Sequence, residues 1–396
     1  MDYKTPLSEL QNRMARFKER MDKDCPNWQT AVIFSKLNLL YFTGSMPEGM
    51  LIIEREKEPV LWVRQSYERV LKESFFNEIK PMKSYRDAAT AYTNLSNTVH
   101  IETSFVPLDM YKRFNKHFPF KNYESLDHQI AMTRAVKSSW ELNFMREAGK
   151  LHQKITLERI PQLLKEGISE AEFAADLYKA MIEEGHMGTA RFNMFDTEML
   201  IGQIGFGDSS IIPTTFNGPG GHRGMYPAVP VLGSRERKLK KGDMVFVDAG
   251  VGINGYHTDK TQLYMYNDSI PEEALKTHNE CVKIQYDIAE MLKPGVTPAH
   301  IYETIINNLP EGFSENFMGY GKRQVKFLGH AIGLTIDEIP VIANGFDEPL
   351  QENMVFALEP KKGIKDFGMV GAENTFIVTP DGGENITGDQ PSFIEI

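Results

Sequence analysis

Five ionisable residues stand where strand-like sequence would normally place apolar side chains. Asp248 ends the run MVFVD, and Asp259 follows eleven residues later in GYHTDKT. His330 lies in FLGHAIGL, Glu359 in VFALEP and Glu373 in VGAENTF. Burying several carboxylates close together is very costly unless cations neutralise them. A lone aspartate of this kind more often ends a strand or forms a turn, but the recurrence of five such residues favours a metal site.

The charge of this set predicts how many ions it holds. Its four carboxylates carry −4, which two divalent ions would balance, so we expect a dinuclear site with His330 as the only nitrogen ligand. An oxygen-rich set favours Mn, Fe, Co or Zn over Cu, and the imidazole disfavours a pure Ca or Mg site. Asp248 and Asp259 would face each other from the two arms of a hairpin.

The part of the chain that must position these residues contains an internal repeat. LKEGISEA (164–171) matches LKPGVTPA (292–299) at an offset of 128 residues (292 − 164), and each copy ends one helix and caps the next with Ser or Thr. Two copies suggest a duplicated domain with a pseudo-twofold axis, whereas a solenoid would need three or more. After the helices, strands are expected over residues 244–253, 354–364 and 373–379. A site between the two halves would draw its ligands from both.

The first part of the chain shows alternating helix and strand patterns and no catalytic cluster. Apolar residues at steps of three and four predict a helix over 7–21, with Ser8 and Gln11 as its capping box. Residues 30–34 and 38–43 are apolar runs of strand length. These patterns predict an α/β domain.

A hairpin over 49–63 is expected to complete the strands of this first part. A further helix begins at SSWE (138–141), where Ser is again followed by Glu three residues later. The boundary is therefore placed just before it, giving domains 1–133 and 134–396.

Composition excludes several classes of protein. The chain has 396 residues, and 44 Lys+Arg against 54 Asp+Glu give a net charge of −10, which argues against general nucleic-acid binding. Two cysteines, Cys25 and Cys281, exclude a disulfide scaffold and a CxxC zinc site and suit a reducing cytosol. No apolar stretch has the length of a membrane span, and MDYKTPLSEL has no signal-peptide core. We expect a soluble cytoplasmic protein.

The motifs together resemble those of the pita-bread metallopeptidases, which include prolidases, Xaa-Pro aminopeptidases and methionine aminopeptidases. DAGVGINGYHTDKT resembles the family's paired-aspartate signature, GHAIGLTIDEIP its histidine motif, and ALEP and VGAENT its two glutamate motifs. ELQNR, NLLYFTG and RAVKSSWE resemble landmarks of the creatinase-type N-terminal domain, so the resemblance covers essentially the whole chain. It implies an α+β protein, with a creatinase-like α/β N-terminal domain followed by a duplicated pita-bread catalytic domain, and a homodimer.

The resemblance also implies a role for each ligand. Asp248 would bind one ion, and Asp259 and Glu373 would bridge two. His330 and Glu359 would bind the other ion, and Glu359 would take the proton from the bridging water as it attacks. The short gap between the two glutamates resembles prolidases more than the longer Xaa-Pro aminopeptidases. Creatinase shares the fold but lacks the full metal set, so the complete set here argues against a metal-free enzyme.

Three positions depart from the family pattern. Asp337 stands seven residues after the ligand histidine, where these peptidases usually carry a second histidine that contacts the substrate carbonyl. Val231 stands where they carry a histidine about 17 residues before the first aspartate, and His222 is the nearest upstream candidate to replace it. Gly371 stands where an arginine often precedes the last glutamate. His257, two residues before Asp259, is a further candidate for contact with the substrate.

These observations predict a dinuclear metal-dependent hydrolase, an aminopeptidase or dipeptidase of Xaa-Pro type that cleaves small peptides through a metal-bridging hydroxide. The first alternative is a metal-dependent hydrolase or lyase of a small non-peptide substrate, such as an amide, on the same fold, which the departures at Asp337, Val231 and Gly371 favour. The second is a non-catalytic binding module. No nucleic-acid or membrane partner is expected.

Overall fold

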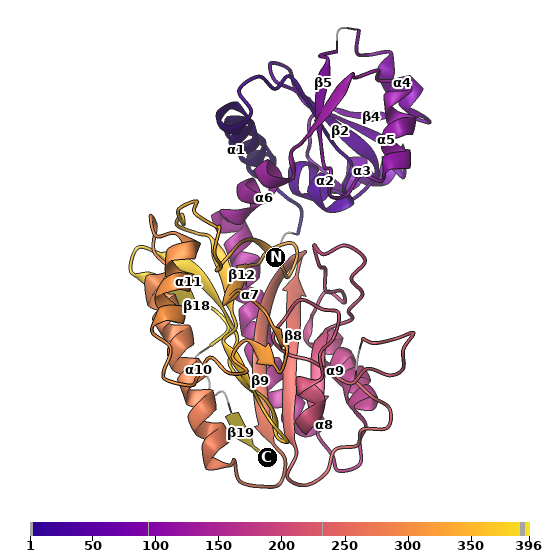
Figure 1. Ribbon diagram of the computed structural model, residues 1–396. Coiled ribbons are helices and arrows are strands. Elements are labelled where there is room, and N and C mark those ends of the chain that lie inside the picture. Colours follow the sequence, from indigo (N-terminus) through magenta and orange to yellow (C-terminus); the bar gives the residue numbers. More distant parts are fainter. Residues whose placement is uncertain (1–2, 94, 232, 389–392) are drawn as a thin grey trace. The chain divides into compact units, whose positions relative to one another are not determined.

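The computed structural model describes residues 3–93, 95–231, 233–388 and 393–396, and the chain forms two compact units that divide between Arg134 and Ala135. The N-terminal unit is built on one mixed six-stranded sheet (Figure 1). Its strands, in spatial order, are β4 (Ile79–Pro81), β3 (Val60–Gln65), β2 (Glu48–Glu54), β1 (Thr30–Ile33), β5 (Thr98–Ile101) and β6 (Asn122–Ser125). Its helices are α1 (Leu7–Asp24), α2 (Lys36–Thr43), α3 (Tyr67–Glu73), α4 (Tyr85–Ala89), α5 (Leu108–Asn115) and α6 (Asp127–Ala135).

Two local predictions for this unit are wrong. The run at 38–43 lies in helix α2, because the carboxylate of Glu102, distant in sequence, accepts hydrogen bonds from the backbone N–H groups of Phe34 (2.6 Å) and Ser35 (2.9 Å) at the start of that helix. Gly44 ends α2 in the left-handed conformation (φ 76°). Helix α1 begins at Leu7, so Ser8 lies inside it and forms no cap. The hairpin predicted over 49–63 is confirmed as β2 and β3.

The C-terminal unit contains two larger sheets. The four-stranded sheet has the order β19 (Phe393–Glu395), β9 (Tyr256–Met265), β8 (Met244–Ile253) and β7 (Gly202–Phe206). The five-stranded sheet has the order β13 (Glu338–Val341), β12 (Gly329–Ala331), β14 (Val355–Leu358), β17 (Asn374–Thr379) and β18 (Gly382–Asn385). Two short ladders pair β10 (Gly319–Tyr320) with β11 (Arg323–Gln324), and β15 (Lys361–Ile364) with β16 (Gly368–Gly371).

Helices cover these sheets from outside. They are α7 (Ser139–Lys154), which continues through a π-helical turn (Ile155–Arg159) into α8 (Ile160–Leu163), then α9 (Glu170–Glu184), α10 (Glu272–Met291) and α11 (Pro298–Asn307), with a 3₁₀ turn at Gly207–Ile211. Helix α7 packs on β8 and β9, whereas α10 and α11 lie at the side of β18 and α8 and α9 at the opposite side of the unit (Figure 1).

The caps predicted from the sequence are present in this unit. Ser138 and Glu141 form the capping box of α7. In the repeat, Ser169 caps α9 and Thr297 caps α11, each accepting a hydrogen bond from the backbone N–H three residues later. The two copies of the LKxG motif therefore have the same local structure.

Candidate metal centre

The β8–β9 hairpin places the two aspartates on one face of its sheet. The register pairs Asp248 with Thr261 and Gly250 with Asp259, so the aspartates are diagonal neighbours rather than directly opposite. Residues two apart on a strand share a face, so both carboxylates lie on the same face of the sheet. The backbone of Asp259 is held by Thr375 of β17, whose hydroxyl accepts from Asp259 N (2.9 Å). The hairpin therefore positions two of the five predicted ligands, Asp248 and Asp259.

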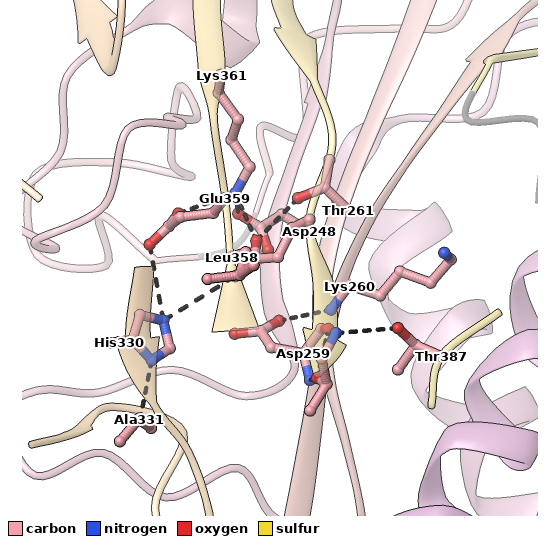
Figure 2. A network of polar contacts seen from close by, with 12 residues as sticks. Asp248, Asp259, Lys260, Thr261, His330, Ala331, Leu358, Glu359, Lys361 and Thr387 are labelled. Carbon is pink, nitrogen blue, oxygen red and sulfur yellow. Dashed lines mark hydrogen bonds and ion pairs between the residues drawn. The ribbon is translucent and has the colours of Figure 1, made fainter. Parts of the chain in front are cut away.

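The other three predicted residues come from the neighbouring sheet. His330 lies on β12, Glu359 directly follows β14, and Glu373 directly precedes β17 and bridges to Thr261. Asp259, His330 and Glu373 each offer a ligand atom, and these atoms lie within 4.8 Å of one another. His330 Nε2 is 3.6 Å from Glu359 Oε1 and 4.0 Å from Glu373 Oε1. The structure thus brings residues far apart in sequence into one cluster (Figure 2).

A lysine that the sequence analysis did not consider occupies the other side of this cluster. Lys361 Nζ donates to Asp248 Oδ2 (2.9 Å), to Glu359 Oε2 (3.1 Å) and to Glu373 Oε2 (2.5 Å). Its side chain is fully buried, and Figure 2 shows it pointing at Glu359 and Asp248. Lys361 follows Glu359 by two residues in an extended segment, and that spacing was the available signal.

The electrostatics of the cluster show an excess of negative charge. Burial, followed by repulsion from Glu373 and Asp248, raises the pKa of Asp259 well above its usual value. Burial also raises the pKa of Asp248 to about 7, although the Lys361 ammonium acts in the opposite direction. Burial lowers the pKa of Lys361, but attraction to its three carboxylates outweighs this and holds that pKa well above the ordinary lysine value. The carboxylates therefore need more positive charge than Lys361 supplies.

The cluster forms one wall of a cavity of about 230 Å³ within the C-terminal unit. Its other walls are mainly apolar side chains, including Phe192, Phe216, Phe327, Ile336 and Ile339. Asp248, Asp259, His330, Glu359 and Glu373 all reach the cavity, and His330 is the only histidine among the described residues that line it. Any molecule in this cavity therefore meets the carboxylates at one end and apolar surface along its sides.

The structure does not bring His222 to this wall. His222 lines a separate cavity together with Val231 and Pro230, and its Nε2 lies 2.6 Å from the carbonyl oxygen of Pro230. Burial lowers the pKa of His222, so the ring is neutral and Nε2–H is the donor to that carbonyl. His222 therefore holds its own loop, and Val231 lies beside it rather than at the carboxylates.

The ring nitrogens of His257 also form hydrogen bonds with backbone groups. Its Nδ1 lies 3.0 Å from the carbonyl oxygen of Gly333, and its Nε2 accepts from the N–H of Arg191 at 3.4 Å. The side chain is fully buried, and burial lowers its pKa to about 4. Both ring nitrogens thus tie loops together, and His257 does not line the carboxylate cavity.

Two departures from the family pattern do fall at the site. Asp337 lines the cavity, and its Oδ1 accepts from the backbone N–H of Asn193 (2.7 Å). Burial raises the pKa of Asp337. Gly371 pairs with Lys361 across β15 and β16, so the position that often carries a cation in the family lies opposite the lysine found here.

The donor set fits a divalent cation. Asp259 and Glu373 supply carboxylate oxygens and His330 supplies an imidazole nitrogen, a mixture typical of Mn, Fe, Co and Zn sites. The excess negative charge of the cluster is the independent reason to expect a cation here.

Comparison with known proteins agrees with this geometry. The chain is 26% identical over 379 residues to the Xaa-Pro dipeptidase of Pyrococcus furiosus, covering 93% of this chain and 98% of that protein. It is 32% identical over 257 residues to the probable dipeptidase PepE of Mycobacterium bovis, covering 64% of this chain and 58% of that protein.

Solved structures show the same fold. The Xaa-Pro dipeptidase from Bacillus anthracis superposes with a TM-score of 0.79 at 20% identity, covering 98% of this chain and all of that one. The N-terminal domain of the FACT complex subunit SPT16 from Cicer arietinum also matches, with a TM-score of 0.72 at 15% identity over 98% of each chain. Fold likeness alone therefore does not decide function.

The sequence profiles are more specific than the fold. Residues 13–136 match the creatinase/prolidase N-terminal domain, which confirms the expected type of the first domain. Residues 143–380, more than half of the chain, match metallopeptidase family M24 and contain all five predicted ligands. The chain belongs to metallopeptidase family M24.

Proposed function

We propose that this enzyme is a dipeptidase that uses a divalent metal ion to hydrolyse the amide bond of small Xaa-Pro peptides. The observation that carries the proposal is the cavity whose charged wall combines Asp259, His330 and Glu373 with Glu359. The names of the relatives, Xaa-Pro dipeptidase in two Pyrococcus species, support the same substrate class.

The position of each residue indicates its role in metal binding or proton transfer. Asp259, His330 and Glu373 would hold the ion, which when bound supplies Lewis-acid polarisation of a carbonyl and activation of water. Glu359 borders the cavity and directs Oε1 toward His330 (3.6 Å), so it would accept a proton at Oε1 and return it to the leaving nitrogen. We propose Mn, Fe, Co or Zn as the ion, and the expectation of two ions stays a prediction.

The cavity suits a small and partly apolar substrate. Its volume of about 230 Å³ is below the ~300–1,000 Å³ of sites for drug-sized ligands, so a dipeptide matches it better than a long peptide. Phe192, Phe216 and Ile336 offer flat and branched apolar surface against which a proline ring could pack. These walls exclude water from the reacting bond and hold the substrate against the carboxylates.

Hydrolysis assays test this proposal directly. The full chain is stripped with a chelator, reloaded with Mn²⁺, Co²⁺ or Zn²⁺, and incubated with Xaa-Pro dipeptides and with matched Xaa-Ala dipeptides. We expect cleavage of Xaa-Pro bonds by the reloaded enzyme and none by the stripped enzyme or by a Glu359→Gln variant. Turnover by stripped protein would refute the metal-dependent mechanism.

One observation favours a second candidate, a metal-dependent hydrolase or lyase of a small non-peptide substrate. The described cavity lining offers Asp337 and no histidine besides His330, so an ionised Asp337 could not donate a hydrogen bond to a developing oxyanion. Absence of dipeptide cleavage with metal bound, combined with turnover of non-peptide amides, would favour this candidate.

Further properties are part of the same proposal. We propose a homodimer in the cytoplasm with domains 1–133 and 134–396. Both cysteines are free, which is compatible with a reducing compartment, and among the described helices none has the length and hydropathy needed to cross a membrane. Light scattering that gives the mass of a single chain would contradict the dimer.

A further inference from the structure

We propose that the ammonium group of Lys361 serves as a built-in cation of the carboxylate cluster, so that the centre holds one divalent ion rather than two. The inference rests on the proposed function, because it takes this cluster as the metal centre. It concerns a residue that neither the ligand set nor the cavity lining contains.

Each of the two glutamates faces His330 with one oxygen and Lys361 with the other. Glu359 directs Oε1 toward His330 (3.6 Å) and Oε2 toward Lys361 (3.1 Å). Glu373 does the same, with Oε1 at 4.0 Å from His330 Nε2 and Oε2 at 2.5 Å from Lys361 Nζ. Each carboxylate thus offers one oxygen to the histidine side and one to the lysine side. The Lys361 ammonium fills the lysine side and leaves the histidine side for a metal.

Asp248 belongs to the lysine side of the cluster. Its Oδ2 accepts from Lys361 Nζ at 2.9 Å, and Asp248 is not among the three residues whose ligand atoms converge. A metal on the lysine side would bind carboxylate oxygens at about 2.0–2.2 Å and would therefore lie within about 5 Å of Nζ. Lys361 already donates to Oδ2 of Asp248 and to Oε2 of both glutamates, so a metal that needs these oxygens would have to displace the ammonium.

The backbone around Lys361 fixes the ammonium in place. Lys361 begins β15 and pairs with Gly371 on β16. A Cβ added to Gly371 would lie 2.4 Å from the carbonyl oxygen of Pro360 and 2.6 Å from Lys361 Cα, so only glycine permits this close pairing. The fully buried side chain passes the ring of Phe246, with Nζ 5.8 Å from the ring centroid. The lysine cannot swing into solvent without opening this packing.

The Lys361 ammonium changes the charge balance of the cluster. Four carboxylates and one ammonium sum to −3, and a single divalent ion brings the cluster to −1. Two divalent ions would bring it to +1 and would place positive charge beside an ammonium that has no route to water. With the ammonium present, the four carboxylates therefore no longer need the full charge of two divalent ions.

Metal stoichiometry tests the inference. The full chain is stripped, dialysed to equilibrium against excess Mn²⁺, and analysed for bound metal by elemental mass spectrometry. We expect one ion per chain for the wild type and for a Lys365→Ala control, which removes an exposed lysine four residues away. We expect two ions for Lys361→Ala, which vacates the lysine side, and one for Lys361→Arg, which keeps the charge.

Electron paramagnetic resonance supplies a readout independent of activity. Bound Mn²⁺ should give the six-line spectrum of an isolated ion in the wild type and an exchange-coupled spectrum in Lys361→Ala. Two ions per wild-type chain, or none, would overturn the inference, and so would a single ion in a folded Lys361→Ala. If that variant does not fold, the wild-type stoichiometry still decides. One bound ion without any Xaa-Pro cleavage would support this inference while contradicting the proposed function.

Discussion

Replacing Lys361 by alanine in metal-free protein should strongly destabilise the C-terminal unit. The change removes three charge-assisted hydrogen bonds of 2.5 to 3.1 Å from a fully buried ammonium and leaves Asp248, Glu359 and Glu373 without their shared cation. Removing one partner of a buried ion pair costs about 3–5 kcal/mol, because the remaining charges stay buried. We therefore expect the free energy of unfolding of the metal-free enzyme to fall by about 3–5 kcal/mol.

Added metal should reverse part of this loss. An ion at one hundred times its Kd stabilises the folded state by about 2.7 kcal/mol for each site. The wild type should gain that amount once, whereas Lys361→Ala should gain it about twice. Urea unfolding followed by far-ultraviolet circular dichroism, with and without Mn²⁺, measures both quantities, and Lys365→Ala serves as the control for loss of an exposed lysine. A metal-free loss below about 1 kcal/mol, or equal gains with metal, would refute the reasoning.

Three further predictions concern histidines. His330→Ala should abolish both bound metal and dipeptide hydrolysis, and a variant that retains one equivalent of metal would contradict its role as ligand. His222→Ala should keep kcat/KM within a few-fold of the wild type, because its ring holds the Pro230 carbonyl away from the carboxylate cavity; a hundredfold loss would place it in the reaction. Burial lowers the pKa of His186 to about 4, so between pH 6.5 and 4 the unfolded chain binds the extra proton and stability falls as the pH falls. From pH 7 to pH 5 His186 should contribute about 2 kcal/mol to this loss, so His186→Asn should lose about 2 kcal/mol less than the wild type in urea unfolding; equal pH slopes would contradict it.

The predicted ligand set was accessible from sequence because each member stands out against its neighbours. A carboxylate at the end of MVFVD or inside VGAENTF interrupts an apolar strand, and that interruption is a local signal. The structure brings all five residues to one cavity wall. The capping boxes at Ser138 and Ser169 were accessible for the same reason, since all of their determinants lie within four residues.

Other features depended on contacts that no local pattern contains. The sequence of helix α2 predicts a strand. The contact that favours the helix comes from Glu102, more than sixty residues later, whose carboxylate accepts hydrogen bonds at the N-terminus of α2. In the sequence, Lys361 and Lys362 resemble a pair of solvated lysines. Only the pairing of β15 with β16, and the contact of Lys361 with Asp248 of β8, show that Lys361 is buried. Lys362 instead donates to backbone carbonyls. His257 could not be distinguished from a catalytic histidine by sequence, because its partners, Gly333 and the N–H of Arg191, are supplied by distant loops.

The net charge of the cluster was harder to predict from the sequence than its carboxylates. The four predicted carboxylates lie together in the structure, but the nearest cation to them is a lysine that the sequence analysis did not consider. The lysine changes that count by one charge, and it occupies the oxygens that a second ion would need.

An anomalous difference map from crystals grown with Mn²⁺ tests the account most directly. It should show one peak per chain, bounded by Asp259, His330 and Glu373, with Lys361 Nζ still in contact with Asp248. A second peak between Asp248 and Glu373, with the lysine displaced, would contradict the account, and so would a map with no peak at the cluster.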